Sequence, residues 1–148
     1  MTIGTRLLMG THIFLYRISG GRVGSKMAGQ SVLLLNTVGR KSGKRYTTPI
    51  NYYLDGENFL VVASNWGQDH HPAWFYNLVH QLVTTIQVKE RVIRVRASQA
   101  SGEDYDRLWN LVAGQNAYYM RYQQQTRRKI PVVILRPVAG IPGGEGRA

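Results

Sequence analysis

Apolar or alternating stretches of strand length recur along the chain and predict a mainly β protein. The most continuous of them, SVLLLNT, is typical of a buried strand. Asp55-Gly56 and Lys89-Glu90 separate neighbouring stretches and predict hairpin turns. The predicted strands are 31–37, 45–54, 58–64, 82–88, 91–98 and 130–138.

Three further segments carry helix signals. Pro72 opens AWFYNLVHQ at the first-turn position that proline tolerates, and Ser101 is placed to cap a helix over 104–114. Residues 1–19 predict an amphipathic helix, which would pack on the protein's own body or lie on a membrane surface. Its apolar face would hold Leu7, Thr11, Phe14, Leu15 and Ile18.

These elements predict the overall architecture. Strands outnumber helices, hairpins dominate and no β-α-β alternation occurs, which favours a small, mostly antiparallel barrel with helices packed outside it. The chain of 148 residues suits one domain over 1–148, with a frayed tail at 139–148. We expect a mainly β fold with packed helices.

The amino-acid composition limits which functional groups and which ligands the protein can use. The chain has no cysteine, which excludes disulfides, thiolate nucleophiles and cysteine zinc sites. Its formal charge is +11, from 19 basic and 8 acidic residues, and this favours an anionic ligand or surface. No nucleic-acid-reading motif accompanies the charge, so we expect no nucleic-acid partner. The N-terminal apolar stretch is too interrupted for a secretory signal and too short to span a bilayer, so we expect a cytoplasmic protein, with membrane association through 1–19 as the alternative.

A cluster of positive charge occupies the turn GRKSGKRYTTP at 39–49. Glycines at 39 and 43 would let backbone N–H groups approach an anion, and Ser42 adds a hydroxyl donor. An ordinary solvated hairpin tip explains the same residues equally well. The cationic side chains are those of Arg40, Lys41, Lys44 and Arg45.

Catalytic side chains of the usual kinds are missing. GRKSGK departs from a phosphate-binding loop, because its glycines are one residue too close and Arg45 replaces the hydroxyl that would bind magnesium. The neighbouring His70 and His71 could not easily share one metal ion, and we expect no metal site. An enzyme without a nucleophilic side chain, metal site or redox-active side chain would use a bound cofactor as its reactive group.

Two segments could form a pocket for such a cofactor. VASNWGQDHHPAW leaves a strand through small residues into a loop with Trp66, where free amides and an indole would suit a flat ring. AYYMRYQ places Tyr118, Tyr119 and Tyr122 close together, and their phenols could wall a pocket or pack a helix.

The residues resemble the deazaflavin-dependent nitroreductase family of the flavin/deazaflavin oxidoreductase superfamily. The resemblance covers about residues 10–138 and rests on LLLNTVGRKSGKRYTTP, VVASNWG, HPAWFYNL and the stretch from Tyr119 to RKIPVVILRP. It implies a split β-barrel that binds coenzyme F-420, an 8-hydroxy-5-deazaflavin with a phosphodiester and an oligoglutamate tail. It also implies hydride transfer from the reduced deazaflavin to an electron-poor small molecule such as a quinone, enone or nitro compound.

The resemblance also implies roles for single residues. Tyr119 and Tyr122 match tyrosines that contact the substrate, and a tyrosine hydroxyl or water would supply the proton. The cofactor-binding positions would be Arg40, Lys41, Ser42, Lys44, Arg45, Thr47, Thr48, Pro49, Ser64, Asn65, Trp66, Pro72, Ala73 and Trp74. One departure concerns the basic turn, because family members often have proline at Arg45 and arginine at Tyr46, and one position reverses the side-chain direction in a strand.

Alternatives to this interpretation come from other classes. A structural relative that binds FMN would also use a basic turn, because both cofactors carry a phosphate and a tricyclic ring. A non-enzymatic fatty-acid- or lipid-binding protein at the membrane would fit the N-terminal helix and the positive charge. The sequence allows a monomer or a homodimer.

Overall fold

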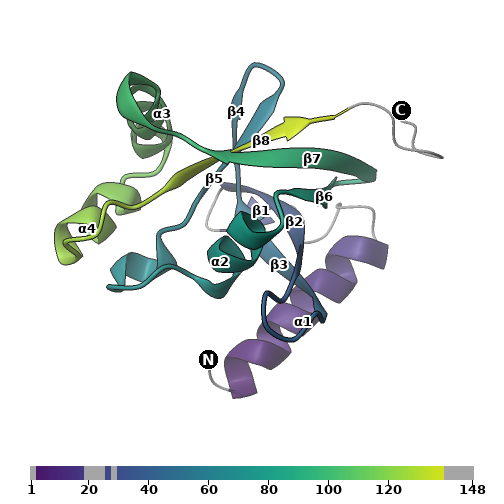
Figure 1. Ribbon diagram of the computed structural model, residues 1–148. Coiled ribbons are helices and arrows are strands. Elements are labelled where there is room, and N and C mark those ends of the chain that lie inside the picture. Colours follow the sequence, from purple (N-terminus) through teal and green to yellow (C-terminus); the bar gives the residue numbers. More distant parts are fainter. Residues whose placement is uncertain (1–2, 19–25, 28–29, 139–148) are drawn as a thin grey trace.

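The computed structural model describes residues 3–18, 26–27 and 30–138, and these form a strongly curled antiparallel sheet with helices around it (Figure 1). Within these residues the sheet has eight strands in the order β1-β2-β6-β7-β8-β5-β4, with β3 paired to β2. The strands are β1 (Lys26–Met27), β2 (Gln30–Val38), β3 (Arg45–Asn51), β4 (Tyr53–Asp55), β5 (Asn58–Val62), β6 (Val83–Val88), β7 (Arg91–Gln99) and β8 (Val132–Pro137).

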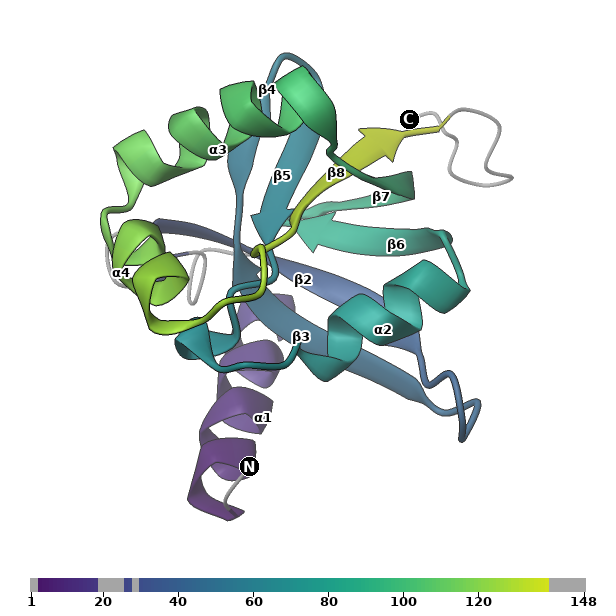
Figure 2. The ribbon, with the colours of Figure 1, turned by 60° about the vertical axis from the view of Figure 1, so that its left-hand side comes forward.

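In the described part of the chain, four α-helices and one 3₁₀ helix surround the sheet. Figure 2 shows α1 against β2 and β3, with α3 and α4 on the far side beside β4 and β5. The short α2 closes the open side of the curled sheet, while α4 contacts the 3₁₀ helix η1. The helices are α1 (Ile3–Ile18), η1 (Asn65–Gly67), α2 (Ala73–His80), α3 (Gly102–Gln115) and α4 (Tyr118–Gln125).

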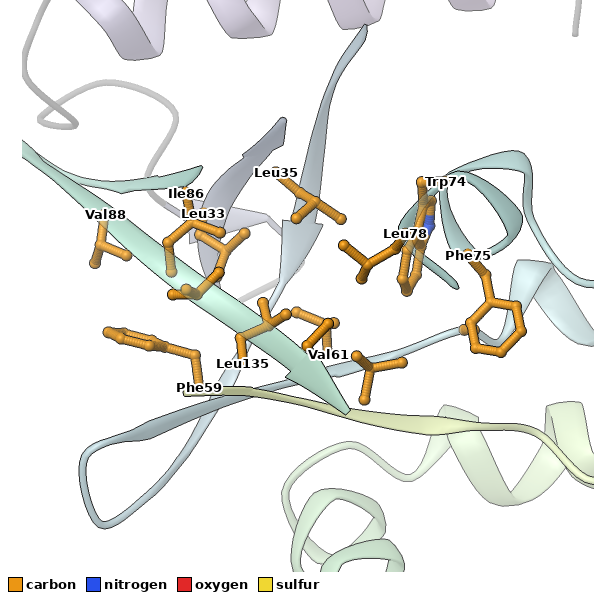
Figure 3. Packing of buried hydrophobic residues seen from close by; sticks show 14 residues of the cluster. Leu33, Leu35, Phe59, Val61, Trp74, Phe75, Leu78, Ile86, Val88 and Leu135 are labelled. Atoms are coloured by element: carbon orange, nitrogen blue, oxygen red, sulfur yellow. The ribbon is translucent and has the colours of Figure 1, made fainter. Parts of the chain in front are cut away.

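The hydrophobic core lies inside the curl, and β2 is buried on both faces, as its apolar run predicts. Leu33 and Leu35 point into the central cluster with Trp74 of α2 (Figure 3), whereas Val32 and Leu34 face α1. Burying one leucine side chain away from water contributes about 1.5–3 kcal/mol to the free energy of folding. The alternation of β2 therefore fixes which face of the β2–β3 hairpin looks into the barrel and which looks toward α1.

Most predicted strands and both hairpin turns are confirmed, but the strand predicted at 45–54 is wrong in one respect. It divides into β3, which pairs with β2, and β4, which pairs with β5. At the break Tyr52 N–H donates to Ser31 O over 3.0 Å. In a sheet that curls into a barrel, a strand bends where it changes from one pairing partner to another. The local pattern of apolar and polar residues does not indicate where that change occurs.

The helix predicted near the N-terminus is confirmed, but its predicted face is wrong. Thr11, Phe14 and Leu15 are exposed, whereas Tyr16 is fully buried against β2 with Ile13 packed beside it. Tyr16 Oη donates to Val32 O over 3.0 Å and accepts from Lys89 N over 2.7 Å. These bonds satisfy the buried phenol hydroxyl. The helical pattern of apolar residues did not include Tyr16 in the predicted buried face. The other two predicted positions of this face, Leu7 and Ile18, have side chains outside those described.

Two helix starts also differ from the sequence interpretation. Pro72 is the N-cap residue of α2 rather than its first helical residue. Ser101 precedes α3 as predicted, but its side chain makes no capping bond, and its carbonyl accepts from Tyr105 N over 3.1 Å instead. The predicted tail at 139–148 lies outside the described residues.

Candidate cofactor and acceptor site

The turn between β2 and β3 carries the cluster of cations, and we call residues 39–44 the basic turn. Gly39 N–H donates to Lys44 O over 2.7 Å, and Gly43 N–H donates to Gly39 O over 2.9 Å. The amides of these two glycines close the turn itself, so the prediction that backbone N–H groups approach an anion here applies to neighbouring amides of the turn. Gly39 is needed for another reason, since a Cβ there would lie 2.6 Å from Ser42 Oγ.

The basic turn is held against α2. Arg40 N–H donates to the buried Asn77 Oδ1 over 3.1 Å, and the Arg40 guanidinium lies 4.8 Å from the Tyr76 ring centroid. Among the described residues the ion pairs join Arg107 to Asp55 and Asp104, so no described carboxylate pairs with the turn. The exposed cations of the basic turn are therefore available to an external anion.

The register of the β2–β3 hairpin separates the site residues predicted on β3. Thr48 lies opposite Leu35 and shares its barrel-side face, whereas Thr47 lies opposite Asn36 on the α1 side. Arg45 and Pro49 share the face of Thr47 because side chains alternate along a strand. The position of Arg45 one residue before Tyr46 thus directs its side chain away from the face of Thr48.

Thr47 already has partners on its own side of the sheet. Its Oγ1 accepts from Arg17 of α1 over 2.9 Å and donates to Asn36 Oδ1 over 2.7 Å. Asn36 Nδ2 in turn donates to Thr85 Oγ1 over 2.8 Å. This polar chain joins α1 to three strands, and it assigns the Thr47 hydroxyl a structural partner on each side.

The predicted ring-contacting loop leaves β5 at Ala63 and Ser64, and its backbone is unusual. Asn65 and Trp66 have φ angles of 47° and 59°, in the left-handed region, and the Trp66 side chain is 72% exposed. Gly67 follows at φ 78°, packed so closely on α4 that a Cβ would lie 3.0 Å from Tyr122 Cα. The loop therefore presents an indole at the surface while its next residue is fixed to α4.

One residue that organises this loop was missed by the sequence analysis. Arg128, between α4 and β8, is half-buried and donates to the backbone carbonyls of Ala63, Ser64 and Gln68 and to a ring nitrogen of His71. It lies in the stretch RKIPVVILRP that supported the family resemblance, but nothing in the local pattern separates it from the exposed Arg127 beside it. Its partners lie about sixty residues away, so only the tertiary structure shows its role.

These contacts favour the neutral form of His71 over the protonated one. Because Arg128 Nη1 donates over 2.8 Å, His71 Nδ1 must accept and its proton must lie on Nε2. Burial lowers the pKa of His71, and the charges of Arg128 and His70 lower it further. The ring also lies 5.5 Å from that of Tyr76, which faces Arg40 of the basic turn. Tyr76 therefore contacts both the loop and the basic turn.

The residues predicted at the start of α2 have different environments. Pro72 is half-buried and Ala73 is exposed beside the loop. Trp74 instead belongs to the central core cluster, where Figure 3 shows it beside Leu78 and Leu35. Pro72 and Ala73 are thus open to a ligand on this side, whereas most of Trp74 is covered.

The tyrosines of α4 face in different directions. Tyr122 lies 6.4 Å from Trp66, edge to face, and stacks at 6.2 Å with the exposed Tyr118. Tyr119 is only 5% exposed, and its hydroxyl accepts from Tyr53 Oη over 3.0 Å. Burial, together with Tyr53, raises the pKa of Tyr119 strongly. The structure therefore brings Tyr122 to the loop and places Tyr119 in the core behind it.

A sequence model of the family described as F420H(2)-dependent quinone reductase matches residues 8–137. The chain belongs to this family. The reductases of the family use coenzyme F420 and a quinone-like acceptor, so the chain is an oxidoreductase and the predicted cofactor is confirmed over FMN.

Individual relatives agree with the family assignment. The F420H(2)-dependent quinone reductase Rv1261c of Mycobacterium tuberculosis is 39% identical over 137 residues, which cover 90% of this chain and 91% of the relative. A solved structure titled as an F420-H2 dependent reductase (FDR-A) has a TM-score of 0.65 and 30% identity, and covers 71% of this chain and 93% of that chain. Another, titled as a domain-swapped dimer, has a TM-score of 0.66 and 30% identity, over 71% of this chain and 79% of that one.

These likenesses confirm the predicted split β-barrel fold. Within the described residues, no helix has the length and apolar character needed to cross a membrane. The same residues contain no group of three histidine or acidic side chains placed to hold a metal ion.

Proposed function

We propose that this quinone reductase holds coenzyme F420 along the side of α2, between the basic turn and the loop that follows β5. The observation that carries the proposal is the position of Tyr76, whose ring contacts both the Arg40 guanidinium and the His71 ring. A ligand with an anionic tail and a flat ring needs a cationic site and an aromatic or amide-rich site close together. Tyr76 brings those two sites to one helix.

The tail would bind to the basic turn. The cations of Arg40, Lys41 and Lys44 are exposed and have no described carboxylate partner, and Ser42 lies among them. Phosphate and carboxylate groups form charge-assisted hydrogen bonds with such side chains, and arginine binds them with two parallel bonds. Because its side chain lies on the α1 face of β3, Arg45 would contribute at longer range.

The ring would lie against the loop at 64–66 and the start of α2. Ser64 and Asn65 have amides that donate no hydrogen bond within the described residues, and Trp66 offers an exposed indole face. Pro72 and Ala73 border the same loop, and Thr48 lies on the barrel-side face of β3. These donors and apolar surfaces fit a heteroaromatic ring with carbonyl groups.

The acceptor would bind beside Trp66 and Tyr122. When bound, the reduced deazaflavin supplies a hydride, and reduction of a quinone to a quinol also requires a proton on oxygen. The Tyr122 ring lies 6.4 Å from that of Trp66, and its hydroxyl would donate that hydrogen bond or proton. Tyr119 would act from behind by fixing α4, because its own hydroxyl is bonded to Tyr53.

The decisive experiment mixes the purified protein with reduced F420 and a soluble naphthoquinone and follows reoxidation of the cofactor. Turnover that requires both reactants supports the proposal. A parallel titration with FMN tests the rival cofactor, and tighter binding of FMN than of F420 would overturn the assignment of the site. Omitting the quinone controls for reoxidation by oxygen.

We also propose that the outer face of α1 contacts a membrane surface. Phe14 is 61% exposed and Leu15 37%, and Arg17 follows them on the same helix. Exposed aromatic and aliphatic side chains next to a cation favour binding at an anionic lipid surface.

Light scattering of the purified protein decides between a monomer and a homodimer.

A further inference from the structure

We infer that Arg128 is a positioning residue, which sets the direction of the two free amides in the ring-binding loop. Its guanidinium donates to Ala63 O over 3.1 Å and to Ser64 O over 2.7 Å. It also donates to Gln68 O over 2.8 Å, at the far end of the same loop. One side chain thus holds both ends of the segment that carries Trp66.

The geometry of the peptide bond connects these carbonyls to the amides. In a trans peptide unit the C=O of one residue and the N–H of the next point in opposite directions, and the described chain has no cis peptide bond. With the carbonyls of Ala63 and Ser64 turned toward Arg128, the N–H groups of Ser64 and Asn65 point away from it. Neither amide donates a hydrogen bond within the described residues. Arg128 therefore presents two parallel donors to the side where the ring is proposed to bind.

Only an arginine fits this arrangement. The bonds leave from three different nitrogens, Nε, Nη1 and Nη2, which lie in one rigid plane, and they reach acceptors in separate parts of the loop. A lysine has one nitrogen, so it could not bond to Gln68 O and Ser64 O in the same directions. Ala63 is fully buried, and an unpaired carbonyl there carries a desolvation cost, so loss of the Arg128 donor favours a change in the loop.

The same residue links the loop to the basic turn. Arg128 Nη1 donates to His71 Nδ1, the His71 ring packs at 4.6 Å on Phe75, and it lies 5.5 Å from Tyr76. The Tyr76 ring in turn contacts the Arg40 guanidinium. Three of these contacts, Arg128–His71, His71–Tyr76 and Tyr76–Arg40, thus join the proposed ring site to the proposed tail site.

This inference rests on the proposed function, because it assigns the amides of Ser64 and Asn65 to the ring. Two probes separate the parts of the ligand: complete F420, and an 8-hydroxy-5-deazaflavin whose side chain ends before the phosphate. The variant is Arg128→Lys, which keeps the charge. The matched control is Arg127→Lys, an exposed neighbour with no described contact. Affinities are measured by fluorescence titration of the oxidised probes.

We expect Arg128→Lys to lower the affinity for both probes by a similar factor, roughly tenfold or more. Arg127→Lys should leave both affinities unchanged. Loss of F420 affinity alone would make Arg128 a tail cation and would overturn the inference. Unchanged affinity for both probes would overturn it as well. If the wild-type protein binds neither probe, the proposed function fails instead, so the two failures are distinguishable.

A second measurement needs no variant and therefore does not depend on how well Arg128→Lys folds. Amide NMR signals of Ser64 and Asn65 are followed in the wild-type protein while the tail-less deazaflavin is added. We expect these two signals to shift and their hydrogen exchange to slow, because both N–H groups gain an acceptor. Binding that leaves both amides unprotected would show that they face elsewhere and would overturn the inference.

Discussion

The Arg40 guanidinium lies over the Tyr76 ring, 4.8 Å from its centroid, while the Arg40 backbone N–H is bonded to the neighbouring Asn77. The turn that carries the positive charge is thus fixed to α2 by two contacts of a single residue. A solvated hairpin tip would need neither of them. This relationship supports the view that the basic turn is held in place for a ligand.

The first prediction concerns this turn. Replacing Arg40 and Lys41 with alanine should weaken F420 binding about tenfold or more and reduce its salt dependence, because two cations that face the tail are lost. The measurement is a fluorescence titration at several ionic strengths. Arg94→Ala with Arg96→Ala removes the same charge from the exposed outer face of β7 and should change affinity little. Equal losses in both double variants would indicate a general charge effect.

The second prediction separates the two tyrosines of α4. Tyr122→Phe should lower turnover with little effect on F420 affinity or stability. Tyr119→Phe leaves the buried Tyr53 hydroxyl without its acceptor, so we expect the unfolding free energy to fall by about 1–3 kcal/mol. Steady-state kinetics and urea denaturation measure the two effects. A Tyr119→Phe protein of normal stability and low turnover would assign the catalytic contact to Tyr119.

The third prediction is a pH dependence of stability that originates at His71. Because burial, Arg128 and His70 lower the pKa of His71 below its ordinary 6.5, the unfolded chain binds this proton more readily than the folded one. The contribution to stability is complete above about pH 6.5 and is lost as the pH falls through the lower, folded-state pKa. Denaturation midpoints between pH 7.5 and about 5 should therefore fall less steeply in His71→Asn than in the wild type. His80→Gln, which removes a histidine from an exposed position on α2, is the matched control.

The fourth prediction tests the fit of the loop against α4. Gly67→Ala places a Cβ against Tyr122 Cα and Gln125 Oε1 and also requires a left-handed φ of 78°. Gly56→Ala, at φ 61° in open space, has the same conformational cost without a clash. Gly67→Ala should therefore be the more destabilising by about 1–3 kcal/mol and should weaken F420 binding. Urea denaturation of both variants checks this, and equal losses would show that the packing is not tight.

The fifth prediction concerns the outer face of α1. Phe14→Ser with Leu15→Ser should reduce flotation with anionic liposomes several-fold, because two exposed apolar side chains are removed. The fold should be little affected, since both residues are exposed. Tyr118→Ser with Met120→Ser, which removes exposed apolar groups from α4, is the matched control. Flotation that is insensitive to the α1 pair would exclude this membrane contact.

Several parts of the site could be predicted from local sequence because local chemistry determines them. The turn at 39–44 must be a hairpin connection, since apolar strand patterns flank it and Gly43 takes the φ of 72° that other residues avoid. The register then follows from the pattern of β2, whose alternate residues are buried on opposite faces. Trp66 was also found, because its loop follows a strand and precedes a proline-led helix.

The sequence by itself determined most of the strands, the basic turn and the resemblance to deazaflavin enzymes, because each depends on neighbouring residues or on motifs in a fixed order. The tertiary structure alone decided which amides are free, which face of α1 is buried, and that Tyr119 lies in the core. It also decided the role of Arg128, whose partners at 63–71 are distant in the chain. Such contacts arise when a sheet curls and brings distant segments together, and no local periodicity records which segments will meet.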